Sequence, residues 1–511
     1  MPNIIIPGFK GGIANSLFDP LSKQTYQTAK GLDVFMFPNI LKPNHDITND
    51  ATDKTLNNIK LNAFIKGSDG KNYFKGFDNS AGTTLTIWDA STGGLGSTTS
   101  LTAETTAAGA GGSHGIVEFL AYLWYFESST VIQNFNFTTI DDAVVASISD
   151  QAPIFVHQGL GKMFYTVSAY QIGSSADITP TNTAVITFDN AMRVVQMAES
   201  GRFVAIGLNH VNGASSSKIA IWDGSSTTID DLIDLGDTGI QSVVNVNGII
   251  YVLTSTNPFG YGAKNLIRIY KIVGSQAKMI KELDLQATTV GAVTINTQAV
   301  VALNGKIYFG MIASSATTIM TIDNGVYAYD TEQNILTLDR ITSDTTAIQI
   351  TSIGFNGGAL VTTWYDGTNY KISHVISTPA VSSSGVYQSN AFFLNNGKRG
   401  KIKRIKILHK ALPASCGFTV KVKHYGHYPS DGSVASADSF TVITTNQGSG
   451  SSTGKTQSTD NTTYTIIEDL DKFKEADMAQ IEIDFDEVSG INAAEILFPI
   501  LIETISTATD I

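Results

Sequence analysis

Short runs of β-branched and aromatic residues alternate with clusters of glycine, asparagine, serine and threonine along most of the chain. Lys218–Asp223 (KIAIWD) shows the pattern, because its short apolar run ends at a turn residue. Runs of this length, separated by turn residues, are typical of β-strands. Apolar residues make up 42% of the chain, which is enough for a substantial core. We therefore predict an all-β protein.

A turn followed by a strand recurs along the middle of the chain. Val246–Leu253 (VNGIIYVL) resembles Leu303–Gly310 (LNGKIYFG), and weaker copies precede and follow them. The copies are anchored at Gly70, Ala121, Gly161, Gly201, Gly248, Gly305 and Gly357, which lie 51, 40, 40, 47, 57 and 52 residues apart. A repeat of this length with about four short strands is typical of a propeller blade, whereas a β-solenoid has a shorter period. We predict a seven-bladed β-propeller over residues 55–379, in preference to six or eight blades.

A second marker of the repeat is an aromatic residue followed by aspartate. It occurs at Trp88–Asp89, Phe188–Asp189, Trp222–Asp223 and Tyr329–Asp330. We expect the aromatic ring to fill the space between stacked sheets. We expect the aspartate to accept hydrogen bonds from the backbone of the following turn.

The two regions that flank the repeat have different patterns. Residues 380–511 contain seven further strand candidates, at 391–394, 402–408, 418–425, 439–444, 463–467, 479–485 and 495–505. This density of strands predicts a jelly-roll-like β-sandwich at the C-terminus. Residues 1–54 contain no copy of the repeat, and turn signals at Gly11–Gly12 and Pro38–Asn39 predict an extended N-terminal arm.

The charge and cysteine content exclude several classes of protein. The chain has 33 lysine and arginine residues against 45 aspartate and glutamate residues, a formal net charge of −12. This balance disfavours specific nucleic-acid binding, which needs a cationic surface. Cys416 is the only cysteine, so no intramolecular disulfide and no multi-cysteine zinc site can form. No apolar run approaches the roughly 20 residues of a membrane helix, and we expect no membrane insertion.

A basic cluster lies near the start of the predicted sandwich. Its members are Lys398, Arg399, Lys401, Lys403, Arg404, Lys406 and Lys410. Such a cluster can dock an acidic partner surface, a phosphate-bearing glycan or nucleic acid. The alternative is a solvated strand edge, at which lysines block pairing with other chains. Ile402, Ile405 and Ile407 lie among the charges and are placed to supply core contacts.

Patterns that indicate catalysis or metal binding are weak. In Gly448–Thr456, Ser449 stands where a phosphate-binding loop needs its first glycine. His424 and His427 lie three residues apart, which places them on opposite faces of a strand. Two acidic groups could hold calcium: Asp230, Asp231, Asp234 and Asp237, and Asp484, Asp486 and Glu487. Neither matches an EF-hand loop, and solvated turns are the preferred interpretation. We expect no catalytic residue, no metal and no cofactor, and predict that the protein is not an enzyme.

Three segments resemble a known family. Ile4–Asn15 (IIIPGFKGGIAN) and Lys30–Leu41 (KGLDVFMFPNIL) are similar to the N-termini of tailed-bacteriophage virion proteins in which a β-propeller follows. Phe392–Lys410 (FFLNNGKRGKIKRIKILHK) is similar to the opening of the β-sandwich in such proteins. The family includes tail nozzle, tail-tip and adaptor proteins, and the resemblance covers the order of parts over nearly the whole chain.

The resemblance implies a structural component of a virion, in the tail or tail-tip complex, assembled in the host cytoplasm. Its implied partners are other tail proteins and further copies of itself in a symmetric ring. The candidate docking residues are Phe9, Gly11, Gly12 and Ile13 in the arm and Lys398, Arg399, Lys401, Lys403, Arg404 and Lys406 in the basic cluster. We expect deletion of residues 1–40 to leave a folded propeller that no longer joins particles.

Two other functions are compatible with the sequence. A glycan-binding adhesin could recognise the host surface by stacking sugars on Tyr261 or Trp364. For Trp364, packing of the ring in the core is an equally good interpretation. A polysaccharide-degrading propeller would need paired carboxylates at the ring centre, and no spacing in the sequence indicates them.

Overall fold

The computed structural model of the chain describes most of the sequence. The described residues are 3–14, 18–37, 39–45, 47, 59–78, 84–90, 99–105, 115–128, 131–138, 140–146, 153–213, 215–256, 266–284, 293–313, 325–341, 349–356, 359–366, 370–373, 385–395, 399–413, 416–426, 439–443, 455–456, 464–467, 473–487 and 494–506. Strands dominate these residues, and the helical elements among them are two single 3-10 turns, η1 (Leu21–Lys23) and η3 (Thr297–Ala299). The all-β prediction is confirmed. No helix in the described part of the chain has the length and apolar character needed to cross a membrane.

The chain divides into two compact units. Unit 1 comprises Met1–Thr48, Tyr327–Ser343 and Ser377–Ile511, and unit 2 comprises Asn49–Val326 and Asp344–Ile376. The boundaries expected from the sequence, at residues 54 and 379, fall within a few residues of two of these borders and stay predictions. The sequence did not indicate that Tyr327–Ser343 groups with the two ends of the chain.

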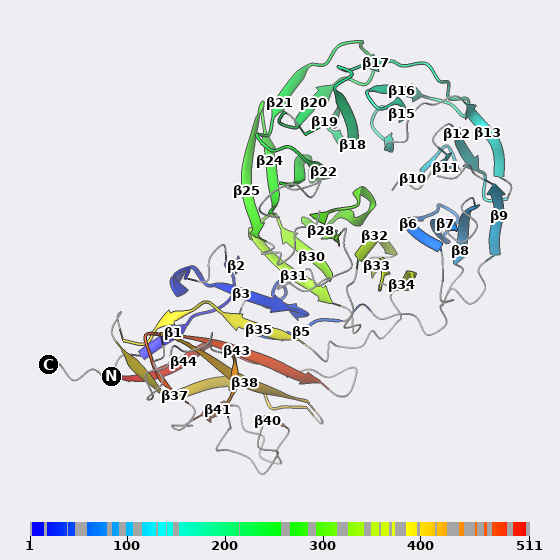
Figure 1. Cartoon of the computed structure of the whole chain (residues 1–511). Coiled ribbons are helices and arrows are strands. Elements are labelled where there is room, and N and C mark those ends of the chain that lie inside the picture. Colours follow the sequence, from blue (N-terminus) through cyan, green and yellow to red (C-terminus); the bar gives the residue numbers. More distant parts are fainter. Residues whose placement is uncertain are drawn as a thin grey trace. The chain divides into compact units, whose positions relative to one another are not determined.

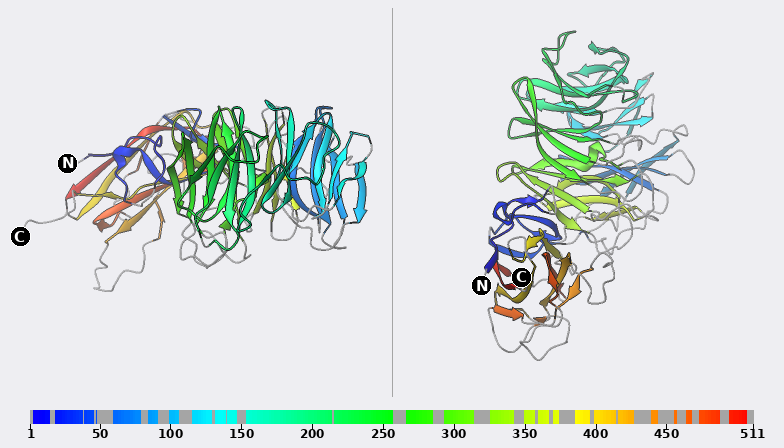
Figure 2. Two further views of the ribbon diagram at one scale, coloured as in Figure 1. Left: turned by 90° about the horizontal axis from the view of Figure 1, so that it is seen from above. Right: turned by 60° about the vertical axis from the view of Figure 1, so that its left-hand side comes forward.

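Unit 2 is built from sheets whose strands follow one another along the sequence. Five of these sheets have four strands each, paired in sequence order. They are β6 (Ile59–Lys66), β7 (Asn72–Asp78), β8 (Thr84–Ala90) and β9 (Thr99–Thr105); β10 (Ile116–Phe119), β11 (Tyr122–Ser128), β12 (Val131–Phe135) and β13 (Ile140–Ala146); β14 (Ile154–His157), β15 (Lys162–Ser168), β16 (Gln171–Ser175) and β17 (Ile186–Thr187); β18 (Met192–Ser200), β19 (Phe203–His210), β20 (Lys218–Trp222) and β21 (Asp231–Asp234); and β22 (Ile240–Val246), β23 (Ile249–Ser255), β24 (Leu266–Val273) and β25 (Gln276–Asp284). Figure 1 shows these sheets arranged around a ring, and Figure 2 shows the same sheets from two other directions. The predicted β-propeller arrangement is confirmed.

The remaining strands of unit 2 lie between the last and the first of these sheets. They are β26 (Val293–Thr294), which pairs with β29 (Ile312–Ala313); β27 (Val300–Leu303), which pairs with β28 (Lys306–Gly310); and the sheet of β32 (Gln349–Asn356), β33 (Ala359–Tyr365) and β34 (Tyr370–Ser373). β32 packs beside both β28 and β6, so the end of the repeat lies next to its beginning. A Cβ atom at Gly354 in β32 would lie 2.1 Å from Phe64 in β6, so glycine permits this close approach.

The anchors of the repeat are turn residues between the first two strands of a sheet. The backbone φ angle is positive at six of the seven: 85° at Gly70, 62° at Ala121, 60° at Gly161, 62° at Gly201, 83° at Gly248 and 76° at Gly305. Gly357 lies outside the described residues. Asn247 and Asn304 also have positive φ angles, as tight turns between right-twisted strands require. The repeat was visible in the sequence because this backbone conformation favours glycine and asparagine.

Two of the aromatic–aspartate pairs behave as expected, and the side chains of Trp88 and Asp89 lie outside the described part of the structure. Trp222 is fully buried at the end of β20 and packs edge-on against Phe164 of the preceding sheet, at 5.5 Å between ring centroids. Asp223 Oδ1 accepts hydrogen bonds from the backbone N–H groups of Ser225 and Ser226, at 2.8 and 2.7 Å. Asp330 makes the same kind of turn. Phe188–Asp189 differs, because it follows a fourth strand rather than a third.

Unit 1 contains two sheets. In the first, the strand order is β4 (Leu32–Asp33), β5 (Ile40–Pro43), β44 (Ile496–Ser506), β37 (Gly400–His409) and β41 (Tyr464–Ile467), with β1 (Asn3–Ile6) beside β44 and β42 (Glu475–Ala476) beside β37. In the second, the order is β30 (Gly325–Asp330), β31 (Ile335–Ile341), β3 (Thr25–Lys30), β35 (Val386–Ser389), β43 (Met478–Glu487), β38 (Cys416–Tyr425) and β39 (Thr441–Val442). Three short strands pair with members of this sheet: β2 (Gly12–Ile13) with β3, β36 (Phe392–Phe393) with β43, and β40 (Lys455–Thr456) with β38. Each of the seven strand segments predicted after Pro379 contains a strand.

The N-terminal segment is part of both sheets of unit 1. Asn3 in β1 pairs with Glu503 in β44, and β3 pairs antiparallel with β35. Phe9 is fully buried and packs edge-on against Phe498, at 5.2 Å between ring centroids. The described residues of the predicted arm therefore form strands and core of unit 1. Both sheets send apolar side chains into one buried cluster, for example Ile405 from β37 and Ile483 from β43.

Candidate docking surface

The basic cluster lies on β37, where buried and partly exposed side chains alternate. Ile402, Ile405 and Ile407 are fully buried, as the sequence predicted, while Lys401, Lys403, Arg404 and Lys406 are partly exposed. The register with β44 shifts between Ile402 and Arg404, which places two cationic residues in succession on the outer side of the sheet. The isoleucine side chains of β37 therefore point into the core of unit 1, and its cationic side chains point away from the core.

β37 is an internal strand of its sheet. It pairs with β44 along one side and with β41 and β42 along the other. Lysines that protect an unpaired edge were the alternative interpretation of this cluster. The pairing contradicts it for most of the strand, because β44 pairs along one edge of β37 and β42 and β41 pair with residues 400–401 and 405–408 on the other.

The cationic row has apolar and acidic neighbours. Arg404 Nη1 lies 3.5 Å from Glu503 Oε1, and Lys406 Nζ lies 5.5 Å from the ring centroid of Tyr464. Lys406 is paired in register with Leu501 of β44, and Leu501 is paired in turn with Ile5 of β1.

We name this outer side the basic face. Its residues are Lys401, Lys403, Arg404 and Lys406 of β37, Leu501, Glu503 and Ile505 of β44, Ile5 of β1 and Tyr464 of β41. Ile5 is 48% exposed and Tyr464 is 42% exposed. Accessible aromatic and aliphatic side chains interspersed with arginine are typical of protein interfaces.

The other candidate docking residues have structural roles. Phe9 belongs to the core, and Gly12 is buried with a φ angle of 75°. A Cβ at Gly11 would lie 2.3 Å from the backbone oxygen of Lys23, and Ile13 pairs in parallel with Tyr26 of β3. The docking role of these four residues stays a prediction. The contacts that they make in the structure are with other residues of unit 1. Arg399 is exposed, and Lys398 lies outside the described residues.

The residues considered for metal binding and sugar stacking do not form such sites in the described part of the chain. No group of three or more histidine, cysteine, aspartate and glutamate side chains there could hold a metal ion. His424 is buried and its Nε2 accepts a hydrogen bond from the Lys474 N–H at 3.3 Å, while His427 is not described. Trp364 is fully buried, so its ring packs in the core and is not accessible to a sugar. Tyr261 and most of Gly448–Thr456 lie outside the described residues.

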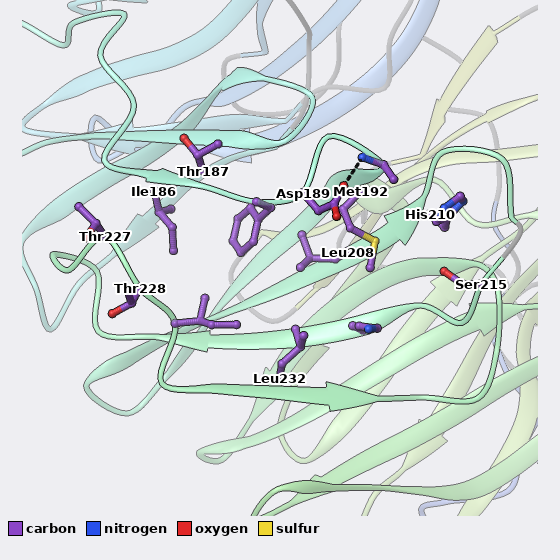
Figure 3. Close-up of a pocket in the computed structure, with 14 residues that line it drawn as sticks. Ile186, Thr187, Asp189, Met192, Leu208, His210, Ser215, Thr227, Thr228 and Leu232 are labelled. Atoms are coloured by element: carbon purple, nitrogen blue, oxygen red, sulfur yellow. Dashed lines mark hydrogen bonds between the residues drawn. The ribbon is translucent and has the colours of Figure 1, made fainter.

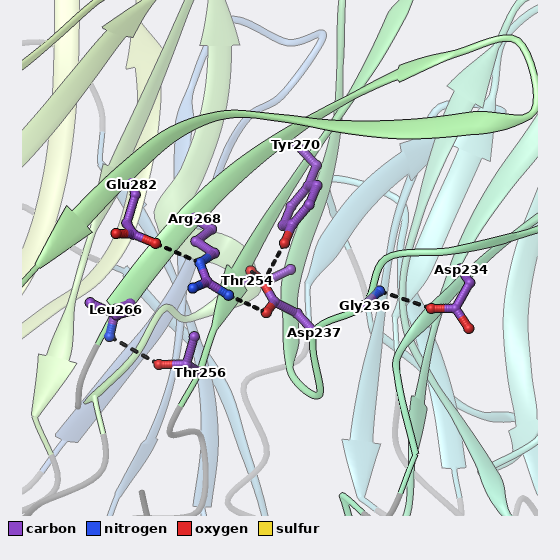
Figure 4. A network of polar contacts seen from close by, with 9 residues as sticks. All are labelled: Asp234, Gly236, Asp237, Thr254, Thr256, Leu266, Arg268, Tyr270 and Glu282. Atoms are coloured by element: carbon purple, nitrogen blue, oxygen red, sulfur yellow. Dashed lines mark hydrogen bonds and ion pairs between the residues drawn. The ribbon is translucent and has the colours of Figure 1, made fainter. Parts of the chain in front are cut away.

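Asp237 is the centre of a polar network in unit 2 (Figure 4). Its carboxylate accepts hydrogen bonds from Arg268 Nη1 at 2.6 Å, Thr254 Oγ1 at 2.7 Å and the Tyr270 hydroxyl at 2.8 Å. Arg268 Nε also donates to Glu282 at 2.8 Å. Burial, and then the hydrogen bond and charge of Asp237, raise the pKa of Tyr270 to about 12. Asp237 is 5% exposed and its carboxylate is satisfied on both oxygens, so we interpret this network as a fastening between the loop after β21 and the next sheet.

Comparisons with known proteins show no relative in sequence. No protein-family model matches the chain, and no curated protein matches it. The computationally designed protein Ika8 is similar over 65% of this chain and 100% of its own length, with a TM-score of 0.38 and 10% identity. The WD40 β-propeller domain of Doa1 is similar over 62% of this chain and 96% of its own, with a TM-score of 0.38 and 12% identity. At these values neither likeness supports a statement about activity or partners.

Proposed function

We propose that the chain is a structural component of a phage virion, in the tail or tail-tip complex, and that it docks neighbouring subunits through the basic face. The observation that carries this proposal is the cationic row on an internal strand. Because β37 pairs with other strands on both of its sides, protection of an unpaired edge does not account for the cationic row. A partly apolar surface with cations in an acidic chain suits an acidic, partly apolar protein surface.

The link to a virion rests on the resemblance of the N-terminal and β37 segments to phage tail proteins. In this proposal the partners are other tail proteins and copies of the same chain in a symmetric ring, and assembly takes place in the host cytoplasm. The proposal assigns no catalytic role, no specific nucleic acid and no membrane insertion.

Two finer features of the fold belong to the same proposal. We infer that β27 and β28 belong to a sixth blade and that β32–β34 form a seventh. The contacts of β32 with β28 and β6 support this count. We also infer that the two sheets of unit 1 form a jelly-roll-like sandwich, and their shared core supports that inference.

Charge reversal tests the docking role better than truncation. Deletion of residues 1–40 would remove β1 and β3 from the sheets of unit 1, so loss of assembly would only report misfolding. Lys403→Glu with Lys406→Glu changes the outer side of β37 alone. The matched control is Lys271→Glu with Lys278→Glu, because these lysines lie opposite each other on β24 and β25 of unit 2.

The expected result is a loss of particle incorporation by about tenfold or more for the β37 pair, as opposite charges across an interface become like charges. Incorporation of the control pair should stay near that of the unmodified chain. Normal incorporation of a folded β37 variant would contradict the proposal, as would an equal loss in both pairs.

Recognition of a host-surface glycan is a second candidate function. The residues first considered for it do not support it, since Trp364 is buried. The observation that favours it is a cleft elsewhere in unit 2, between β17 and the sheet of β18–β21.

A further inference from the structure

A cleft of about 580 Å³ opens in unit 2 where one sheet covers the next incompletely (Figure 3). The covering strand β17 has only two residues, Ile186 and Thr187, whereas β18 and β19 of the following sheet have nine and eight. The face of the longer sheet therefore extends past its neighbour. Cavities of this size accommodate small organic ligands.

One wall of the cleft comes from that uncovered face. His210 is paired in register with Met192, Leu208 with Lys218 and Ala220 with Leu232, so these side chains alternate onto one side of the sheet. Leu208 is buried, whereas Leu232 is 44% exposed at the outer strand. Phe188 and Asp189, in the turn that joins β17 to β18, also line the cleft.

The cleft is apolar in its middle and polar at both ends. Figure 3 shows Thr187, Thr227 and Thr228 toward one end and His210 and Ser215 toward the other, with Leu208 and Met192 between them. A ligand with an apolar face and polar groups around its rim fits this distribution.

The polar groups include both donors and acceptors. Asp189 can only accept, Lys218 can only donate, and the serine and threonine hydroxyls can do both. His210 Nδ1 accepts from the Asn212 N–H at 3.3 Å, which leaves the other ring nitrogen to carry the proton. A site for a simple anion would need only hydrogen-bond donors, and a site for a simple cation would need only acceptors. The mixed lining of this cleft fits neither.

The charges near Lys218 also disfavour an anion. Lys218 is paired in register with Asp234, and Asp189 also lines the cleft. Hydrogen bonds from Ser216 and Gly236, and then the charge of Lys218, lower the pKa of Asp234, so this carboxylate stays ionised beside the lysine. An anionic ligand would meet the Asp189 carboxylate in the lining of the cleft, and an ammonium group whose charge Asp234 already offsets.

We propose that this cleft binds a neutral oligosaccharide. Sugar hydroxyls donate and accept at many positions, and the C–H face of a pyranose ring packs on apolar side chains such as Phe188 and Leu232. This inference deepens the second candidate function and does not depend on docking by the basic face. Because its test uses the isolated full-length chain, its failure is distinguishable from a failure of assembly.

Saturation-transfer NMR on the full chain tests the proposal with maltotriose, cellotriose, chitotriose and lactose. Irradiation of the protein methyl groups should transfer saturation to the ring protons of at least one of these sugars. Lys218→Met removes a donor while keeping the stem, and Leu232→Ser removes an apolar contact at an exposed position. Each should weaken binding by about tenfold, the equivalent of one hydrogen bond or one apolar contact.

The matched control is Val273→Ser, because Val273 is 56% exposed in the same unit but does not line the cleft. Its binding should equal that of the unmodified chain. The proposal is overturned if none of the four sugars receives saturation at millimolar concentration, or if both cleft variants bind as the control does. It is equally overturned if 1-naphthalenesulfonate binds through Lys218 while the sugars do not, since the ligand is then an apolar anion.

Discussion

The two units of this chain obtain their strand partners in opposite ways. In unit 2, Val246 pairs with Ile249 across a turn of two residues, and each four-stranded sheet is a continuous stretch of sequence. In unit 1, Asn3 pairs with Glu503, and three separate segments of the chain share two sheets. Unit 2 therefore depends on packing between successive local sheets, whereas unit 1 depends on bringing the two ends of the chain together.

Because of this difference, substitutions should destabilise the two units at different kinds of residue. In unit 1 the sensitive residues include those of the N-terminal segment, which holds positions in both sheets. In unit 2 they include residues that fasten one sheet to the next, such as Asp237.

The largest effect should come from Phe9→Ala, which removes a fully buried ring that packs on Phe498. Large-to-small changes of this kind cost about 3–5 kcal/mol. We expect the unfolding transition of unit 1 to move to lower temperature in calorimetry, with the transition of unit 2 unchanged. Met36→Ala is the control, because Met36 is in the same segment but 72% exposed. Equal melting of the two variants would show that the N-terminal segment is not part of the core.

A somewhat smaller effect should come from Asp237→Ala in unit 2. This change leaves Arg268, Tyr270 and Thr254 without the carboxylate that accepts their hydrogen bonds. Removal of one partner from such a network costs about 2–4 kcal/mol. Urea unfolding should show a lower midpoint for unit 2, while Asp230→Ala, at an exposed neighbouring position, should leave it in place. A midpoint for Asp237→Ala that equals the control would refute the fastening role.

The smallest effect, of opposite sign, should come from Tyr387→Phe in unit 1. The Tyr387 hydroxyl is fully buried and has no hydrogen-bond partner within the described part of the chain. Burial, and then the charge of Tyr26, raise the pKa of Tyr387 above its ordinary value. In the folded unit the Tyr387 hydroxyl therefore stays protonated, whereas in the unfolded chain it loses its proton above about pH 10. The contribution of this group to the free energy of unfolding is fully present below that pH and decreases as the pH rises above it.

Tyr387→Phe should raise the stability of unit 1 by about 1 kcal/mol at pH 7 and reduce its decline above pH 10. Thermal unfolding measured from pH 7 to pH 11 checks both parts. A variant that melts lower than the unmodified chain at pH 7 would mean that the hydroxyl contributes a stabilising contact.

The comparison also explains which features the sequence could predict. The repeat was detectable because turns such as Asn247–Gly248 require positive φ angles, and that requirement leaves a local trace in the sequence. The place of residues 3–6 beside β44 leaves no such trace, because the partner residues lie at the opposite end of the chain. The strands of the C-terminal region were visible as apolar runs, but their order in the sheets was not.

The candidate sites follow the same rule. The cations of β37 are evident in the sequence, whereas the internal position of the strand depends on β41 and β42, which lie far along the chain. The cleft was not predicted, because it arises from the difference in length between β17 and the strands of the following sheet. The sequence left Trp364 open between sugar stacking and core packing, because a strand-end aromatic residue has the same local pattern whether it is buried or exposed.

Lysine reactivity in assembled particles tests the docking role of unit 1 most directly. Free protein and particles that contain it would be treated with an amine-reactive label, and modification would be measured by mass spectrometry. We predict that Lys403 and Lys406 on the basic face lose most of their reactivity on assembly, while Lys271 and Lys278 in unit 2 keep theirs. Unchanged reactivity of Lys403 and Lys406 in particles, or protection confined to Lys271 and Lys278, would contradict the account.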